Sequence, residues 1–170
     1  TFFDGECAVI ATDIPAEEQG TGMLFNMDGE VVGMISSSVW NDTGKNVVNA
    51  YGISDLKPII ELLINGKSVP YIGIYGTTVT EQLAEEHKMP SGIYVADVDP
   101  DSPAMAAGIQ IGDIICEASG EEIKDIAAYQ NIVIGSSVGE TMEFVGKRLG
   151  SDGYVNIKFS VVTTEKEEVK

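Results

Sequence analysis

Residues that build metal sites and disulfide frameworks are scarce in this chain. Among its 170 residues there are two cysteines, Cys7 and Cys116, and one histidine, His87. The cysteines lie far apart in apolar, strand-like surroundings, which predicts small core residues rather than a disulfide or a metal ligand. With a single histidine and no Cys-x-x-Cys pair, the sequence predicts no structural zinc site, and we expect no metal and no cofactor.

Positive charge is scarce as well. Lysine and arginine number 10 against 27 aspartate and glutamate residues, which gives a formal net charge of −17, and the acidic residues are spread along the chain. This charge argues against nucleic acid and anionic membrane surfaces as partners. No apolar run approaches the roughly 18 residues of a membrane span, so we expect none in this chain. Thr1 in place of an initiating methionine suggests a fragment or a processed product with its targeting information upstream.

The sequence predicts two modules. Apolar residues make up 44% of the chain, enough to build the core of one ordinary domain or of two small ones. The first module, residues 1–67, is mostly β. Apolar runs predict strands over residues 6–14 and 47–53 and a hairpin over residues 23–38 with its turn at Asp28-Gly29.

A helix closes the first module. From residue 54 to residue 64 apolar side chains recur at helical spacing, so one face is expected to pack on a core. Ser54 is the expected N-cap, and Pro58 falls in the first turn, where its missing N–H costs little. Gly66 is expected to end the helix, and the boundary between the modules follows at residue 68.

The second module, residues 68–164, alternates strands with helices. The predicted order is strand, helix, strand, short helix, strand, helix and two closing strands, a small partly open barrel with one long helix beside an edge. Expected helix caps are Thr78 or Thr80, Ser102 and Asp125. Residues 165–170 form a charged tail that we expect to be frayed.

The second module begins with SVPYIGIYG, residues 68–76. Gly73 permits a backbone angle or a close approach that other residues do not. Such a turn can direct successive N–H groups at an anion, the geometry needed to hold a peptide's terminal carboxylate while the peptide adds to a strand edge. The alternative is an ordinary hairpin strand with a glycine kink.

Two motifs of the second module resemble the PDZ domains of the bacterial HtrA/DegP class. YIGI resembles the carboxylate-binding loop of that class, and VDPDSPAMAAGIQIGDII resembles its run of Ser-Pro, Ala-Gly and Gly-Asp elements. The resemblance implies a groove between a strand over residues 72–75 and a helix over residues 125–133 that takes peptide or protein C-termini by strand addition. By position it implies these peptide-binding residues: Lys67, Tyr71, Ile72, Gly73, Ile74, Ile126, Tyr129, Gln130 and Val133.

The first module is similar to the last part of the trypsin-like protease domain of the same family. The pieces that carry the similarity are ATDI, GTGMLFNMDGEVVGMI and NAYGI. The nucleophile turn of the family reads Gly-Asn-Ser-Gly-Gly-Pro-Leu, and here Gly20 or Thr21 stands at the serine position. His87 belongs to the second module, where a solvated surface role is expected. We therefore expect no Ser-His-Asp triad in this chain and little or no peptidase activity.

Two further features carry less information. Asp97, Asp99 and Asp101 alternate as in some calcium loops, but the distal glutamate of an EF-hand is not at its spacing, so a solvated loop is expected. Trp40 is either a packing anchor or an exposed recognition aromatic, and both readings stay open.

The expected fold class is mainly β with α+β: a partial trypsin-like β-barrel segment followed by a PDZ domain. Three functions stay open: a pseudoprotease that retains peptide recognition, part of an active serine endopeptidase of envelope protein quality control, and a structural scaffold. The resemblance implies a bacterial cell envelope or extracellular location. Because strands of the partial barrel lack partners, we expect a homo-oligomer formed by strand pairing.

Overall fold

The computed structural model describes residues 7–15, 20–36, 39 and 47–165. Trp40, the loop over residues 41–46 and most of the predicted tail lie outside these residues. The chain divides into two compact units, one formed by Cys7–Asn65 and the other by the chain from Gly66 onward. We describe each unit by itself.

The N-terminal unit is built on a four-stranded antiparallel sheet with the order β1-β4-β3-β2. The predicted hairpin is confirmed, and its turn contains Gly29 at a φ of +80°. The strands are β1 (Val9–Pro15), β2 (Gly22–Phe25), β3 (Val31–Ile35) and β4 (Val47–Gly52).

Helix α1 (Ile53–Ile64) packs on this sheet through Leu56 and Ile59, which are buried. The predicted cap at Ser54 is wrong. Strand β4 passes directly into the helix, and Gly52 occupies the N-cap position without a side-chain hydrogen bond. The Gly52 N–H donates to the Ala8 carbonyl at 2.8 Å, so strand pairing fixes the backbone up to the first turn.

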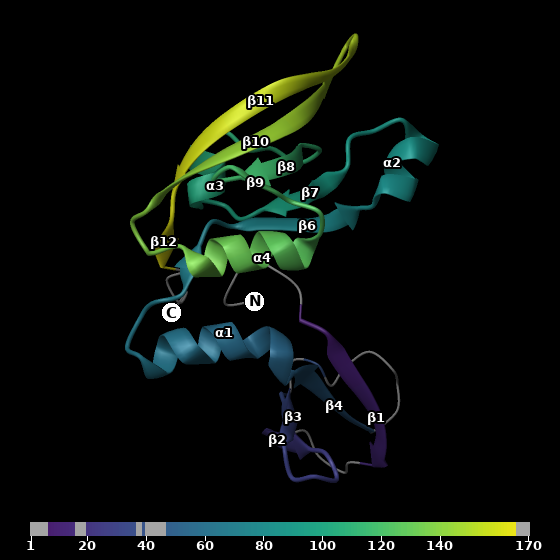
Figure 1. The fold of residues 1–170 in the computed structure, drawn as a ribbon, viewed down its shortest axis with the longest axis vertical. Helices are drawn as coiled ribbons and strands as arrows, with labels where there is room; N and C mark the ends of the chain where they lie inside the picture. The colour runs from purple at the N-terminus through teal and green to yellow at the C-terminus, as the bar shows by residue number, and fades with distance from the viewer. Residues whose placement is uncertain (1–6, 16–19, 37–38, 40–46, 166–170) are drawn as a thin grey trace. The chain divides into compact units, whose positions relative to one another are not determined.

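The C-terminal unit contains a six-stranded antiparallel sheet in which β11-β10-β8-β7-β6 follow one another and β9 pairs with β8 (Figure 1). Its longest pair is the β10–β11 hairpin, two strands of ten residues each. The strands are β6 (Ile74–Val79), β7 (Gly92–Val98), β8 (Ile114–Ala118), β9 (Glu121–Glu122), β10 (Thr141–Gly150) and β11 (Gly153–Val162).

Side-chain caps set the start of three helices in this unit. The helices are α2 (Glu81–His87), α3 (Pro103–Ala106) and α4 (Ile126–Gly135). Thr80, Ser102 and Asp125 each accept a hydrogen bond from an N–H in the first turn of the following helix. These caps confirm the sequence prediction, with Thr80 rather than Thr78 before α2.

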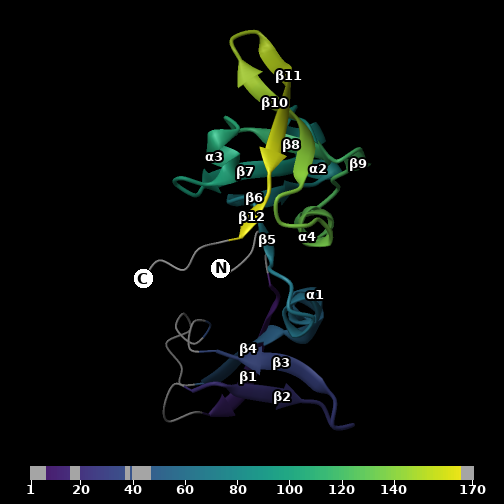
Figure 2. The same ribbon diagram turned by 90° about the vertical axis from the view of Figure 1, so that its left-hand side faces the viewer.

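The strand expected over residues 72–75 is only partly correct, because Ile72 and Gly73 lie between two strands. Strand β5 (Pro70–Tyr71) pairs with β12 (Thr164–Glu165), and β6 begins only after Gly73 (Figure 2). Thr163 holds the chain in place just before β12, since its hydroxyl donates to the Ser137 carbonyl at 2.6 Å. Glu165, which the sequence places in the charged tail, is therefore paired with Pro70.

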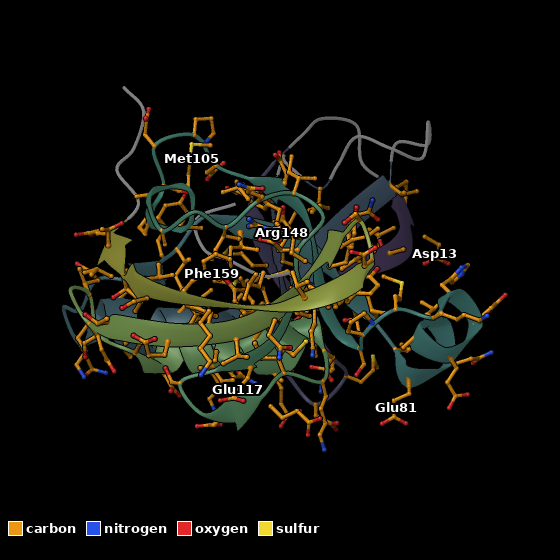
Figure 3. The ribbon with its side chains drawn as sticks, turned by 90° about the horizontal axis from the view of Figure 1, so that it is seen from above. Asp13, Glu81, Met105, Glu117, Arg148 and Phe159 are labelled. Carbon is orange, nitrogen blue, oxygen red and sulfur yellow. The ribbon has the colours of Figure 1, made fainter. Side chains whose placement is uncertain are left out.

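An ion pair supports the core of the C-terminal unit. The Asp113 side chain is only 1% exposed and accepts hydrogen bonds from Arg148 Nε at 2.6 Å and Arg148 Nη2 at 2.8 Å. This hydrogen bonding raises the pKa of Arg148 despite its partial burial. The guanidinium also lies 5.8 Å from the ring centroid of Phe159 (Figure 3). The Gly-Asp motif was evident in the sequence, but its arginine partner was not.

Replacing Asp113 with alanine should lower the free energy of unfolding by about 3 kcal/mol, because it leaves Arg148 without its buried acceptor. The Gln110 N–H, which also donates to Asp113, loses its partner too. Urea denaturation followed by circular dichroism measures the effect. Asp152→Ala, in the exposed turn after β10, is the control and should change stability by less than about 0.5 kcal/mol. Equal stability of the two variants would contradict the role given to the pair.

Candidate functional site

One edge of the C-terminal sheet lies beside a helix. Strand β6 is the last strand of the sheet among the described residues, and α4 contacts both β5 and β6. The Ile126 N–H at the start of α4 donates to the Thr78 hydroxyl at 3.0 Å, so the helix is bonded to the strand at this end (Figure 1). Strand β6 and α4 are therefore the elements between which the predicted peptide groove would lie.

The turn between β5 and β6 has its carbonyl groups fixed on one side. The Ala104 N–H donates to the Ile72 carbonyl at 3.0 Å, and the Asp99 N–H donates to the Gly73 carbonyl at 2.9 Å. No peptide bond in the described chain is cis. Because a trans peptide directs its N–H opposite to its C=O, the N–H groups of Gly73 and Ile74 point away from the segment that holds the two carbonyls. Two consecutive N–H groups on one side can bind an anion.

Gly73 is required by this turn for two reasons. Its φ is +93°, a conformation that side chains with a Cβ rarely adopt. A Cβ added here would lie 2.4 Å from the Ser102 Cβ and 2.8 Å from the Tyr71 hydroxyl oxygen, which is far closer than atoms approach without displacement. Since Ser102 also caps α3, the turn packs directly on the start of that helix.

The four predicted residues of α4 differ in exposure. Tyr129 and Val133 belong to the core, and Tyr129 packs against Phe144 with ring centroids 6.5 Å apart. Gln130 is buried, and Ile126 packs against the core while partly exposed. The structure places all four on the helix that borders β6, and their contact with a peptide stays a prediction.

The other predicted residues lie as follows. Tyr71, Ile72, Gly73 and Ile74 are all buried, and their contact with a ligand stays a prediction. Lys67 is exposed in the segment between α1 and β5, and its role stays a prediction.

Two residues that contact the ends of this turn, Tyr75 and Asp99, were not among the predicted site residues. The Asp99 carboxylate accepts hydrogen bonds from the hydroxyls of Tyr71 and Tyr75. The symmetric string Y-I-G-I-Y, with an aspartate after the next strand, was the signal that could have suggested them.

The position of the family's serine, Gly20 or Thr21, and the histidine of the chain, His87, belong to different units. Gly20 and Thr21 are exposed and precede β2 in the N-terminal unit. His87 is exposed at the end of α2 in the C-terminal unit. Among the described residues, no group of three or more His, Cys, Asp or Glu side chains could hold a metal ion.

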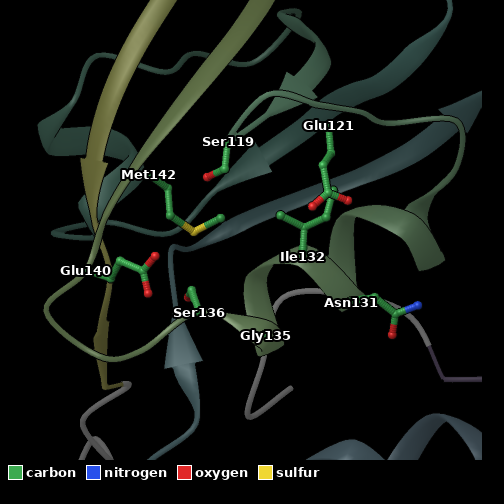
Figure 4. Close-up of a pocket in the computed structure, with 8 residues that line it drawn as sticks. All are labelled: Ser119, Glu121, Asn131, Ile132, Gly135, Ser136, Glu140 and Met142. Atoms are coloured by element: carbon green, nitrogen blue, oxygen red, sulfur yellow. The ribbon is translucent and has the colours of Figure 1, made fainter.

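A separate hollow of about 330 Å³ lies along α4 (Figure 4). Ile132 and Met142 lie between the carboxylates of Glu121 and Glu140 in this view. None of the predicted peptide-binding residues lines it. Its lining residues are Ser119, Glu121, Asn131, Ile132, Gly135, Ser136, Glu140 and Met142.

Residues 94–148 match the PDZ domain family. The match includes α3 and α4 with Ile126, Tyr129, Gln130 and Val133, and it begins after the β5–β6 turn. No helix in the described part of the chain has the length and apolarity to cross a membrane.

Curated relatives extend the likeness to both units. The chain is 30% identical over 155 residues to a probable periplasmic serine endoprotease DegP-like of Halomonas elongata, covering 87% of this chain and 32% of that protein. It is 30% identical over 174 residues to the serine protease Do-like HtrA of Bacillus subtilis, covering 94% and 38%. The chain thus spans about a third of the length of the curated relatives it matches.

A solved structure shares the fold. The HtrA-type protease AlgW with decapeptide matches with a TM-score of 0.55 and 21% identity, covering 86% of this chain and 45% of that one. At 21% identity this similarity shows a shared fold and nothing further.

Both thiols are free, and both should react slowly with iodoacetamide near neutral pH. Burial and the charge of Asp55 raise the pKa of Cys7 to about 11, and burial raises the pKa of Cys116 despite the opposing charge of Lys147. Because only the thiolate is alkylated, the rate should rise about tenfold per pH unit from pH 7 to pH 9. Mass spectrometry of quenched samples measures the rate, with the guanidinium-unfolded chain as control. Equal rates for folded and unfolded chain at pH 7.5 would contradict the raised pKa values.

Proposed function

This chain is an HtrA-like relative of the DegP-type serine endoproteases and contains a PDZ domain, and on this premise we propose that its C-terminal unit binds the carboxyl ends of peptides or proteins. Several of the relatives are named periplasmic endoproteases. We accordingly place the protein in the bacterial cell envelope, with a role in protein quality control, and assign the PDZ domain to residues 68–164.

The direction of the turn's N–H groups carries the proposal. The ligand's terminal carboxylate would accept hydrogen bonds from the Gly73 and Ile74 N–H groups, which point away from the segment that holds the carbonyls. The preceding ligand residues would add as a strand to β6, with their side chains between β6 and α4. Lys67 would supply positive charge near the carboxylate. That AlgW, which shares the fold, was solved with a decapeptide is consistent with this use.

Recognition rather than hydrolysis is the function we assign to this chain. A hydroxyl nucleophile requires a base within hydrogen-bond reach, itself oriented by a third group. The one histidine, His87, is exposed on α2, and the position equivalent to the family's serine is Gly20 or Thr21. Proteolysis by a longer protein would need residues that this chain does not supply.

A peptide with a free carboxyl terminus should bind at least about tenfold more tightly than the same peptide amidated, because amidation removes the charged acceptor of two N–H groups. Fluorescence polarisation with a library of labelled C-terminal peptides measures the difference. Gly73→Val should abolish the preference, since the side chain cannot fit beside Ser102.

Gly135→Ala is the matched control, because an added Cβ there meets no atom within 4 Å. It should bind like the parent. If the parent binds free and amidated peptides equally, the carboxylate site is not used, and the scaffold function becomes the better explanation.

We also propose self-association through the N-terminal sheet. Its end strands are β1 and β2, and Met23 and Phe25 on β2 are 53% and 58% exposed. An apolar edge of this kind favours pairing with a second strand.

Sedimentation equilibrium should therefore show a mass above that of the monomer that increases with concentration. Met23→Lys should shift the chain toward monomer, because a charge on an edge strand opposes pairing. Leu149→Lys, an equally drastic change at an exposed position of β10, should not. A parent that is monomeric up to about 0.1 mM would refute strand pairing.

A further inference from the structure

Asp99 contacts the β5–β6 turn on both sides of its glycine. It follows β7, and its Oδ2 atom accepts hydrogen bonds from the hydroxyl of Tyr71, at the end of β5, and from the hydroxyl of Tyr75, in β6, at 2.9 Å for the latter. Its backbone N–H donates to the carbonyl of Gly73 between them. One residue is therefore bonded to positions 71, 73 and 75.

The tyrosine hydroxyls connect this carboxylate to the conformation of Gly73. The Tyr71 hydroxyl oxygen occupies the space beside Gly73, 2.8 Å from where a Cβ would stand. The bond to Asp99 fixes the hydroxyl there. In the same way, the bond from Tyr75 fixes the chain two residues after the glycine. One carboxylate oxygen therefore holds the chain on both sides of Gly73.

Neighbouring aspartates do not share this arrangement. Asp97 is exposed and its Oδ1 accepts from the N–H of Val98, the next residue in the chain. Asp101 is exposed at a φ of +59°. Asp99 is half-buried, and its side-chain bonds span 24 and 28 residues of sequence. Asp97 and Asp101 are therefore exposed, whereas Asp99 joins segments that are distant in sequence.

We propose that Asp99 is a positioning residue for the carboxylate site: by accepting from Tyr71 and Tyr75 and donating to Gly73, it holds the Gly73 and Ile74 N–H groups in the direction that a ligand carboxylate requires. This inference rests on the proposed peptide-binding function. The role is orientation, because the Asp99 side chain lies on the carbonyl side of the turn and the ligand on the N–H side. Binding that depends on oriented donors is lost when the donors are free to rotate.

The test compares the ratio of dissociation constants for one amidated and one free-carboxyl peptide of the same sequence across variants of the full chain. Asp99→Ala should reduce this ratio about tenfold, since it removes the acceptor of two hydroxyls. Asp99→Asn keeps an acceptor oxygen and should stay within about threefold of the parent. Tyr75→Phe, which removes one hydroxyl, should fall between them. Asp97→Ala, with the same change of charge two residues away, should match the parent.

A residue that only stabilises the fold would lower the affinity for both peptides together and leave the ratio unchanged. A folded Asp99→Ala variant with the parent's ratio therefore overturns the inference while the peptide-binding function stands. A parent that does not distinguish the two peptides overturns that function, and this inference with it. If Asp99→Ala fails to fold, Tyr75→Phe decides, together with the amide chemical shift of Gly73 in the absence of peptide. A Gly73 shift and a ratio equal to those of the parent in Tyr75→Phe would overturn the inference.

Discussion

The candidate site depends on the direction in which two carbonyl groups of the β5–β6 turn are held. Ile72 and Gly73 lie between two strands, and their carbonyls are bonded to the N–H groups of Ala104 and Asp99. Because the peptide bonds are trans, this fixes the opposite direction for the N–H groups that follow. The turn thus supplies positive potential from the main chain itself, to which Lys67 would add its charge. Its donors are main-chain dipoles whose direction is set by Asp99, after β7, and Ala104, in α3.

This arrangement explains how a strongly acidic chain can be suited to carboxylate ligands. A net charge of −17 disfavours anions at long range, but charges beyond about 8 Å are largely screened at physiological salt. Within that distance the oriented N–H groups contribute a positive potential. Asp99, which contacts the turn, has its carboxylate oxygen bonded to the hydroxyls of Tyr71 and Tyr75.

Local signals in the sequence predicted most of the elements. The Asp28-Gly29 turn, the helix caps Thr80, Ser102 and Asp125 and the long closing hairpin all follow from rules that involve residues close in sequence. The cap predicted at Ser54 failed because strand pairing at Gly52 fixes the backbone before the serine is reached. The break of the expected strand at Gly73 also escaped prediction, since β12, from the far end of the module, pairs with β5.

The sequence by itself determined where glycine is obligatory, where helices begin and how apolar residues alternate, because each of these depends on backbone angles and on neighbours within a few positions. It also indicated the residues of the β5–β6 turn through their motif. Only the tertiary structure decided that Asp99 bonds to Tyr71 and Tyr75 and that Asp113 bonds to Arg148, which lies 35 residues away. Such pairs depend on how strands align in a sheet. The sequence alone therefore does not distinguish one acidic residue of a polar run from its neighbours.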